Sequence, residues 1–125
     1  MRNVLITGGA GNIGSSLCDF FLTDSDEWNV TVVDNLLTGK RSNLNLKHPH
    51  LRFIKGDVNS YEEIAPVITS GNFEFIFHYA AVVGVERTVN RPIMVLQDVQ
   101  GIRHILELSK VAGVRRIFFS SNQSP

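Results

Sequence analysis

The sequence predicts a doubly wound α/β fold, in which helices cover both faces of one parallel sheet. Short apolar runs typical of buried strands alternate with longer segments whose apolar residues recur at helical spacing. The first apolar run leads directly into glycines, and the second ends at an acidic residue, Asp34. Because parallel strands are joined by right-handed crossovers, we expect the strand order 3-2-1-4-5, with the chain stopping after the fifth strand.

The first strand and the first helix have the strongest local signals. A strand is expected at residues 2–7, which are apolar and β-type up to the glycines. A helix is expected at residues 12–22, because apolar residues recur there at helical spacing: Ile13, Leu17 and Phe20 to Leu22. Cys18 falls on the apolar side of this helix, so it is interpreted as a small buried residue.

The remaining elements continue the alternation. Strands are expected at residues 29–34, 51–55, 74–79 and 115–120, and helices at 60–69 and 91–112. Pro92 fits the first turn of the long helix and Gly113 fits its end. The apolar positions along that helix are Ile93, Leu96, Ile102, Ile105, Leu106 and Leu108. Residues 35–50 contain glycine, proline and several polar residues, which indicates a loop with at most one helical turn.

Composition limits the classes of protein to which the chain can belong. With 43% hydrophobic content, residues 1–125 can bury a single core, and one domain is expected. Twelve basic residues balance twelve acidic ones, so no overall field is present to hold nucleic acid or an anionic membrane. The sequence shows no basic-then-apolar leader and no long uncharged apolar stretch, which predicts a soluble, cytoplasmic protein. The single cysteine, Cys18, can form no internal disulfide and fits a reducing compartment; a catalytic thiol is the weaker alternative.

The glycines at positions 8, 11 and 14 are typical of a phosphate-binding turn. Glycine lacks the Cβ atom that would block the turn, the approach of a diphosphate to the backbone and the packing of the helix on the strand. The free N–H groups and the positive dipole end of the helix would then face the phosphates. A plain strand-to-helix turn without a ligand is the alternative, and the position of Asp34 argues against it.

Asp34 stands where a dinucleotide-binding fingerprint places an acidic residue, about 20 positions beyond the glycines at the tip of the second strand. Its carboxylate can accept hydrogen bonds from two ribose hydroxyls, whereas it would repel a 2′-phosphate. This favours NAD over NADP, although Lys40 and Arg41 lie close enough in sequence to keep NADP as an alternative. Asp34 could instead cap a following turn.

The glycine run Thr7-Gly8-Gly9-Ala10-Gly11-Asn12-Ile13-Gly14 resembles the nucleotide-binding motif of the short-chain dehydrogenase/reductase superfamily. Its glycine spacing is one residue wider at the start than Gly-x-Gly-x-x-Gly. Further motifs narrow the likeness to the extended branch, the NAD-dependent nucleotide-sugar epimerases, dehydratases and decarboxylases: Asp34 to Lys40, Gly56-Asp57-Val58, His78-Tyr79-Ala80-Ala81 and Phe118 to Ser121. The resemblance covers essentially the whole chain. It implies a Rossmann-type fold and the amino-terminal, NAD-binding portion of such an isomerase or lyase.

The resemblance implies cofactor contacts along one edge of the sheet. The residues carried over are Gly8, Gly11, Asn12, Ile13, Gly14, Asp34, Asn35, Gly39, Lys40, Asp57, Val58, Tyr79, Ala80, Ala81 and Val83. Among them, Asp57 would accept the adenine amino group and Val58 would pack on the ring. Asp57 could also cap the helix that begins near Tyr61. Ala80 and Ala81 are small enough to lie under the dinucleotide.

Substrate contacts are implied for Gly84, Val85 and Arg87. Arg87 could pair bidentately with a sugar-nucleotide phosphate, or be a solvated surface residue. No metal site is expected, because His78 has no partner at ligand spacing and His48-Pro49-His50 has no cysteine or carboxylate pattern around it.

The catalytic pattern is the main departure from the family. Relatives end the fifth strand with hydroxyl residues that contact the reacting sugar oxygen. Here that position falls on Asn122, with Ser121 or Ser124 reachable by a shift, so Ser121 and Asn122 are the catalytic candidates. The chain contains no Tyr-x-x-x-Lys, since Ala65 and Val83 stand four residues after its tyrosines. We therefore expect no turnover by this chain alone, and a nucleotide-sugar substrate only in a longer form.

Three functions compete on this basis. The favoured one is the NAD-binding portion of a nucleotide-sugar epimerase, dehydratase or decarboxylase. The alternatives are a free-standing NAD(P)-binding or regulatory module, or an atypical short-chain reductase, and a structural protein that keeps the fold without the ligand. The fifth strand would be an exposed edge. The helix at 91–112, which takes part in the dimer interface of relatives, could join two copies into a homodimer.

Overall fold

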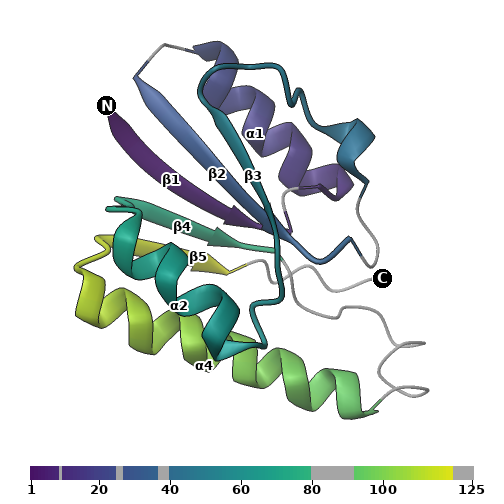
Figure 1. The fold of residues 1–125 in the computed structure, drawn as a ribbon, viewed down its shortest axis with the longest axis vertical. Helices are drawn as coiled ribbons and strands as arrows, with labels where there is room; N and C mark the ends of the chain where they lie inside the picture. Colours follow the sequence, from purple (N-terminus) through teal and green to yellow (C-terminus); the bar gives the residue numbers. More distant parts are fainter. Residues whose placement is uncertain (9, 25–26, 37–39, 80–91, 120–125) are drawn as a thin grey trace.

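The computed structural model describes residues 1–8, 10–24, 27–36, 40–79 and 92–119, with the backbone alone for Asn12, Asp24 and residues 92–100. These residues form one parallel five-stranded sheet in the order β3-β2-β1-β4-β5. The strands are β1 (Arg2–Thr7), β2 (Trp28–Asp34), β3 (Leu51–Lys55), β4 (Phe75–His78) and β5 (Arg116–Phe119); the helices are α1 (Asn12–Asp24), α2 (Tyr61–Ser70) and α4 (Pro92–Ala112). α1 covers one face of the sheet, and α2 and α4 cover the other (Figure 1). The predicted fold class and strand order are confirmed.

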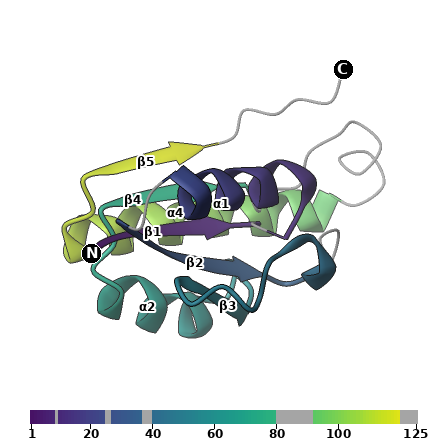
Figure 2. The same cartoon turned by 90° about the horizontal axis from the view of Figure 1, so that it is seen from above.

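Every expected strand and helix is present, and the structure differs from the expectation only in where these elements begin and end. α1 continues to Asp24, beyond the expected end at residue 22. β4 is shorter than expected by one residue at either end, and β5 begins one residue later than expected, while its expected last residue, 120, lies outside the described residues. The single helical turn allowed in the loop after β2 is a 3-10 helix at Arg41–Asn43. Seen from above, this loop and β3 lie at one side of the sheet and β5 lies at the other (Figure 2).

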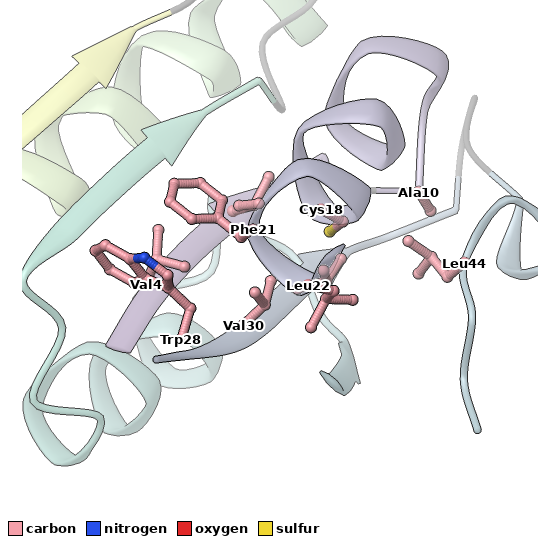
Figure 3. Close-up of a cluster of buried hydrophobic side chains, with 10 residues drawn as sticks. Val4, Ala10, Cys18, Phe21, Leu22, Trp28, Val30 and Leu44 are labelled. Carbon is pink, nitrogen blue, oxygen red and sulfur yellow. The ribbon is translucent and has the colours of Figure 1, made fainter. Parts of the chain in front are cut away.

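The apolar side of α1 packs on the sheet and forms the first core cluster (Figure 3). Alternate residues of β1 and β2 point toward it, because successive side chains of a strand face opposite sides. Phe21 packs edge-on against Trp28, with ring centroids 4.8 Å apart, and its centroid lies 5.7 Å from that of Phe77. Cys18 lies in the cluster, as predicted, and burial raises the pKa of its thiol to about 12. The buried members are Val4, Ile6, Ala10, Cys18, Phe21, Leu22, Trp28, Val30, Val32 and Leu44.

Two apolar residues of α1 lie outside this core. Ile13 is 51% exposed and Phe20 is 59% exposed. Adjacent helical residues are about 100° apart around the axis, so Phe20, Phe21 and Leu22 cannot all face the sheet. The core takes Phe21 and Leu22, which leaves Phe20 in solvent with its ring edge against Phe21.

The second core cluster lies between the sheet and the helices α2 and α4. Its buried members are Leu5, Val33, Val58, Ile64, Ile68, Phe73, Ile76, Ile105 and Leu108. On α4, Ile105 and Leu108 therefore face the core as predicted, whereas Leu106 is 48% exposed. The side chains of Ile93 and Leu96 lie outside the described residues. In the described part of the chain, no helix combines the length and the apolar character needed to cross a membrane.

The end of α4 follows the predicted chemistry. Gly113 has a φ of +77°, a left-handed conformation that glycine adopts without a steric penalty. The N–H of Val114 donates to the carbonyl of Ser109 at 3.1 Å, which is the longer bond of a Schellman motif. This turn directs the chain into β5.

β5 is the outermost strand on its side of the sheet, as predicted. Phe118 and Phe119 are 41% and 40% exposed on it. Phe118 stacks on Phe77 of the neighbouring strand with ring centroids 4.7 Å apart, so its inner side is packed and its outer side is not.

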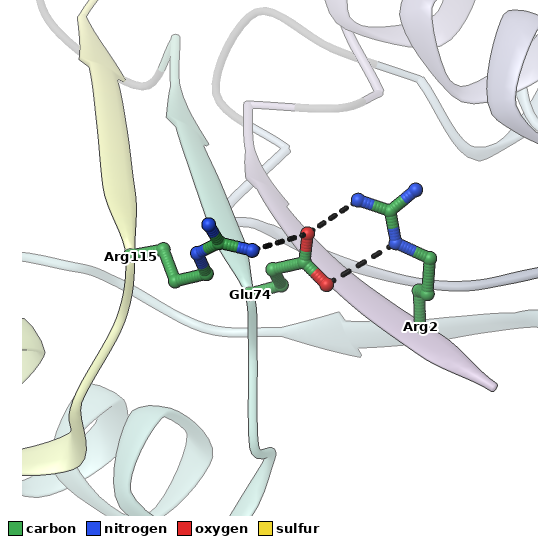
Figure 4. Close-up of polar contacts among 3 residues, drawn as sticks. All are labelled: Arg2, Glu74 and Arg115. Carbon is green, nitrogen blue, oxygen red and sulfur yellow. Dashed lines mark hydrogen bonds and ion pairs between the residues drawn. The ribbon is translucent and has the colours of Figure 1, made fainter.

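Ion pairs join three strands at their amino ends (Figure 4). Arg2 of β1 donates to both carboxylate oxygens of Glu74, which precedes β4, and Arg115, which precedes β5, lies 3.9 Å from the same carboxylate. The hydrogen bond and charge of Arg2 lower the pKa of Glu74. The guanidinium of Arg2 also lies 4.3 Å from the ring centroid of Trp28.

Candidate functional site

The turn after β1 has the backbone shape that its glycines predict. Gly8 has a φ of +72°, and its N–H donates to the carbonyl of Val33 in β2 at 2.8 Å. The chain then tightens, since the N–H of Gly11 donates to the Gly8 carbonyl at 3.1 Å. The first i to i−4 bond of α1 runs from the N–H of Ser15 to the carbonyl of Gly11 at 2.9 Å. The N–H groups of residues 12–14 therefore have no acceptor within the helix and point out of its end.

Gly11 and Gly14 differ in their surroundings. Gly14 is buried, in keeping with close packing of the helix on the strand. A Cβ added at Gly11 would lie 3.4 Å from the Gly8 carbonyl oxygen, which is an ordinary contact. The fold itself therefore tolerates a side chain at position 11. A side chain there would instead obstruct a ligand that approaches the bare backbone from outside.

Asp34 ends β2 directly beside this turn. Its side chain is 6% exposed; Oδ2 accepts the N–H of Ala10 at 3.0 Å and Oδ1 accepts the N–H of Leu36 at 2.7 Å. The bond to Leu36, which has a φ of +64°, is the turn cap weighed as the alternative role. Each carboxylate oxygen has about two acceptor positions, so this cap leaves capacity for two further donors.

Hydrogen bonds of the Ala10 backbone connect the glycine turn to the loop after β2. Its N–H bonds Asp34, while its carbonyl accepts the N–H of Lys40 at 3.0 Å and Nδ2 of Asn43 at 2.8 Å. Asn43 was not among the predicted site residues. A polar residue in a loop gives no sign of such a distant partner. The side chains of Lys40 and Asn35 are exposed, and the guanidinium of Arg41 lies 5.2 Å from the ring centroid of Phe53.

The end of β3 lies next to Asp34. The N–H of Gly56 donates to the Asp34 carbonyl at 3.2 Å. Asp57 then accepts the N–H of Asn59 on Oδ1 at 2.9 Å, so it caps the turn before α2. The helix itself begins after Ser60, which stands at the N-cap position. Val58 is 4% exposed and packs in the second core cluster.

The end of β4 is joined to β1 by a buried hydrogen-bonded pair. Oγ1 of Thr7 lies 2.6 Å from Nδ1 of His78, and the N–H of Tyr79 donates to the Thr7 carbonyl at 2.9 Å. His78 is 2% exposed, and burial lowers its pKa to about 4, so the imidazole is neutral near pH 7. The sequence did not indicate that Thr7 and His78 would be partners.

The structure thus brings the described candidates to one edge of the sheet. Residues 8, 56 and 79 follow the carboxyl ends of β1, β3 and β4, residue 34 ends β2, and backbone hydrogen bonds link each end to its neighbour. In doubly wound sheets ligands bind outside these ends, where the strand order reverses, here between β1 and β4. The remaining candidates lie outside the described residues: Gly39, Ala80, Ala81, Val83, Gly84, Val85, Arg87, Ser121 and Asn122.

Comparison with protein families finds that the model of the NAD dependent epimerase/dehydratase family matches residues 4–124. Among curated proteins, a putative UDP-glucose 4-epimerase of Methanocaldococcus jannaschii is 31% identical over 120 residues, which are 95% of this chain and 37% of that protein. A UDP-glucose 4-epimerase of Klebsiella pneumoniae is 31% identical over 95% of this chain and 88% of its own recorded length. The chain spans about a third of the length of the other relatives of this name.

Solved structures of UDP-glucose 4-epimerases also resemble this chain. The UDP-glucose 4-epimerase of Thermotoga maritima, solved with UDP-glucose, has a TM-score of 0.88 and 34% identity, covering 97% of this chain and 38% of that one. The UDP-glucose 4-epimerase of Thermus thermophilus, solved with NAD, has a TM-score of 0.83 and 30% identity, covering 93% of this chain and 36% of that one.

Proposed function

We propose a function from one premise: the chain belongs to the NAD dependent epimerase/dehydratase family, whose model matches residues 4–124. These residues bind NAD and form the cofactor-binding domain of an enzyme that acts on a nucleotide sugar. Fold alone does not fix function, so the proposal depends on the chemistry at the carboxyl edge of the sheet.

The observation that carries the proposal is the place of the Asp34 carboxylate. It lies 3.0 Å from the N–H of Ala10, inside the glycine turn, and keeps acceptor capacity on both oxygens. A buried carboxylate beside outward-pointing N–H groups of a helix end suits a ligand that carries hydroxyls next to phosphates. The ribose and diphosphate of a dinucleotide meet both requirements.

The roles of the other residues follow from this placement. The backbone of Gly8, Gly11 and Gly14, with the N–H groups of Asn12 and Ile13, would receive the diphosphate. Asn35 and Lys40 would flank the ribose, and Asp57 and Val58 the adenine. Tyr79, with Ala80, Ala81 and Val83, would border the nicotinamide half. Gly84, Val85 and Arg87 remain the proposed substrate contacts.

NAD is proposed as the cofactor in preference to NADP. A 2′-phosphate would approach the Asp34 carboxylate and be repelled by it. In titration calorimetry we expect wild type to bind NAD more tightly than NADP, and Asp34→Asn to bind NAD at least about tenfold more weakly. Asp19→Asn removes the same charge from an exposed position on α1 and serves as the control. Equal affinity of wild type and Asp34→Asn for NAD would contradict the assigned role.

Reaction chemistry is proposed for a form that includes more than these residues. NAD supplies transient hydride transfer to and from the sugar when bound. This chain's share is to hold and orient the dinucleotide, since no Tyr-x-x-x-Lys occurs within its 125 residues. Incubating the purified chain with NAD and UDP-glucose is expected to give no epimerised, dehydrated or decarboxylated product by chromatography. Product formed by this chain alone would contradict the proposal that it only holds and orients the dinucleotide.

A further inference from the structure

We propose that α4 holds the adenine end of the dinucleotide site in shape, acting through Gly101 and His104 on the loop at residues 57–59. The inference rests on the function proposed above, in which Asp57 and Val58 receive the adenine. Both α4 residues are positioning residues, because their contacts are with the loop that joins β3 to α2.

Gly101 allows the backbone of α4 to approach this loop. It is buried, and an added Cβ would lie 2.5 Å from Oδ1 of Asn59 and 3.1 Å from Cγ2 of Val58. The contact of 2.5 Å is with the end of the Asn59 side chain, which can rotate away, whereas the contact of 3.1 Å is with Val58, which is packed in the second core cluster and has little room to move. A side chain at position 101 therefore turns the Asn59 side chain and pushes Val58 by a few tenths of an ångström.

His104 lies about one turn further along α4 and bonds the same loop. Its Nδ1 is 2.9 Å from the carbonyl oxygen of Val58. A carbonyl oxygen can only accept, so Nδ1 carries the proton and donates. The imidazole also meets the ring of Tyr61 edge-on, with centroids 5.4 Å apart. The Val58 peptide is thus oriented from α4 by a side chain that is itself held in place.

Hydrogen bonds within the loop carry this constraint to Asp57. Oδ1 of Asp57 accepts the N–H of Asn59 at 2.9 Å, and the N–H of Asp57 donates to Oε1 of Glu63 at 3.3 Å. The backbone N–H of Asn59 is hydrogen-bonded to the Asp57 carboxylate. A displacement of Val58 and Asn59 therefore turns that carboxylate. α4 therefore sets the direction of the group that is proposed to accept the adenine amino group.

The test compares four variants of the whole chain. Gly101→Ala introduces the Cβ, His104→Phe keeps a ring without the donor, and His104→Asn restores an N–H donor. Leu106→Ala changes an exposed position of the same helix and is the control. Calorimetry measures the affinity for NAD and for nicotinamide hypoxanthine dinucleotide, whose purine has no amino group. Thermal melting checks that each variant is folded.

We expect Gly101→Ala and His104→Phe to weaken NAD binding by about tenfold. The affinity for the hypoxanthine analogue falls less, so the preference for NAD shrinks, which a general loss of folded protein would not produce. His104→Asn regains most of the affinity, and Leu106→Ala behaves as wild type. Gly101→Ala is expected to stay folded, because the higher helix propensity of alanine offsets part of the cost of pushing Val58.

Hydrogen exchange gives a second readout without any ligand. The backbone N–H of Asn59 is expected to exchange faster in Gly101→Ala and His104→Phe than in wild type or Leu106→Ala. If wild type binds no dinucleotide, the proposed function is overturned and this inference with it. If wild type binds NAD while Gly101→Ala and His104→Phe match Leu106→Ala in affinity and selectivity, the inference alone is overturned.

Discussion

Two glycines of the same turn are needed for different reasons. Gly8 has a φ of +72°, which an L residue adopts at a cost of roughly 1–2 kcal/mol. Gly11 is in no such region, and a Cβ there would make an ordinary contact with the Gly8 carbonyl. The backbone therefore requires glycine at position 8, whereas glycine at position 11 matters for what approaches from outside.

This difference predicts opposite effects of two alanine substitutions. Gly11→Ala is expected to leave the melting temperature nearly unchanged and to weaken NAD binding at least about tenfold, because the new methyl group meets the diphosphate. Gly8→Ala is expected to lower the free energy of unfolding by roughly 1–2 kcal/mol. Calorimetry and urea unfolding of both variants measure this. Unchanged NAD affinity in Gly11→Ala would show that no ligand approaches the turn.

The buried pair of Thr7 and His78 predicts a dependence of stability on pH. Burial lowers the pKa of His78 to about 4 from its ordinary value of 6.5. Between these values the unfolded chain binds a proton that the folded chain does not, so the free energy of unfolding falls as pH falls from 6.5 to 4. This single group contributes up to about 3 kcal/mol to the change.

Urea unfolding between about pH 7 and pH 4 measures the effect. His78→Asn keeps a polar partner for Thr7 and removes the titrating group, so its stability should fall less over this range than that of wild type. His50→Asn, at a half-buried histidine, is the matched control and should keep the wild-type slope. A slope in His78→Asn as steep as in wild type would refute the assignment to His78.

At the scale of the element, α1 separates packed from exposed aromatic residues within one turn. Phe21 is 7% exposed between Trp28 and Phe77, whereas Phe20 is 59% exposed. Phe21→Ala is expected to lower the free energy of unfolding by about 3–5 kcal/mol, since it leaves a cavity in the first core cluster. Phe20→Ala should change it by no more than about 0.5 kcal/mol. Equal losses in urea unfolding would contradict the packing described for α1.

The sequence predicted those elements that depend on local chemistry. Alternating periodicity placed the strands and helices, and the glycine turn followed by Asp34 located two candidate site elements that the structure brings together. Contacts between distant segments gave no such signal. The bonds of Asn43 to the Ala10 carbonyl and of His104 to the Val58 carbonyl join residues more than thirty positions apart. Helical spacing also included Leu106, although the sheet can cover only one side of α4.

At the scale of the whole molecule, the described residues leave apolar side chains exposed on α4 and on the edge strand β5, besides Ile13 and Phe20 of α1. Leu106 and Val111 are 48% and 81% exposed on α4, and Phe118 and Phe119 are about 40% exposed on β5. Unpaired strand edges and apolar helix faces both favour association between chains. Association is therefore expected, and the two surfaces can be distinguished.

The predicted homodimer uses α4. Sedimentation of wild type is expected to give a dimer, and Val111→Lys is expected to give a monomer, because a buried cation would lack a partner. Phe118→Lys places the same charge on β5 and should leave the dimer intact. A monomer from Phe118→Lys together with a dimer from the α4 variant would assign the contact to the edge strand.

The direction of β1 has a practical consequence for attaching the protein to a surface. Arg2 and Gly8 lie at opposite ends of this strand, and its six residues extend about 20 Å at roughly 3.3 Å per residue. A biotin or fluorophore linked at Met1 therefore sits beside the Arg2–Glu74 pair, away from the glycine turn. A molecule immobilised through Met1 on a sensor chip would present the carboxyl ends of its strands to the analyte in solution.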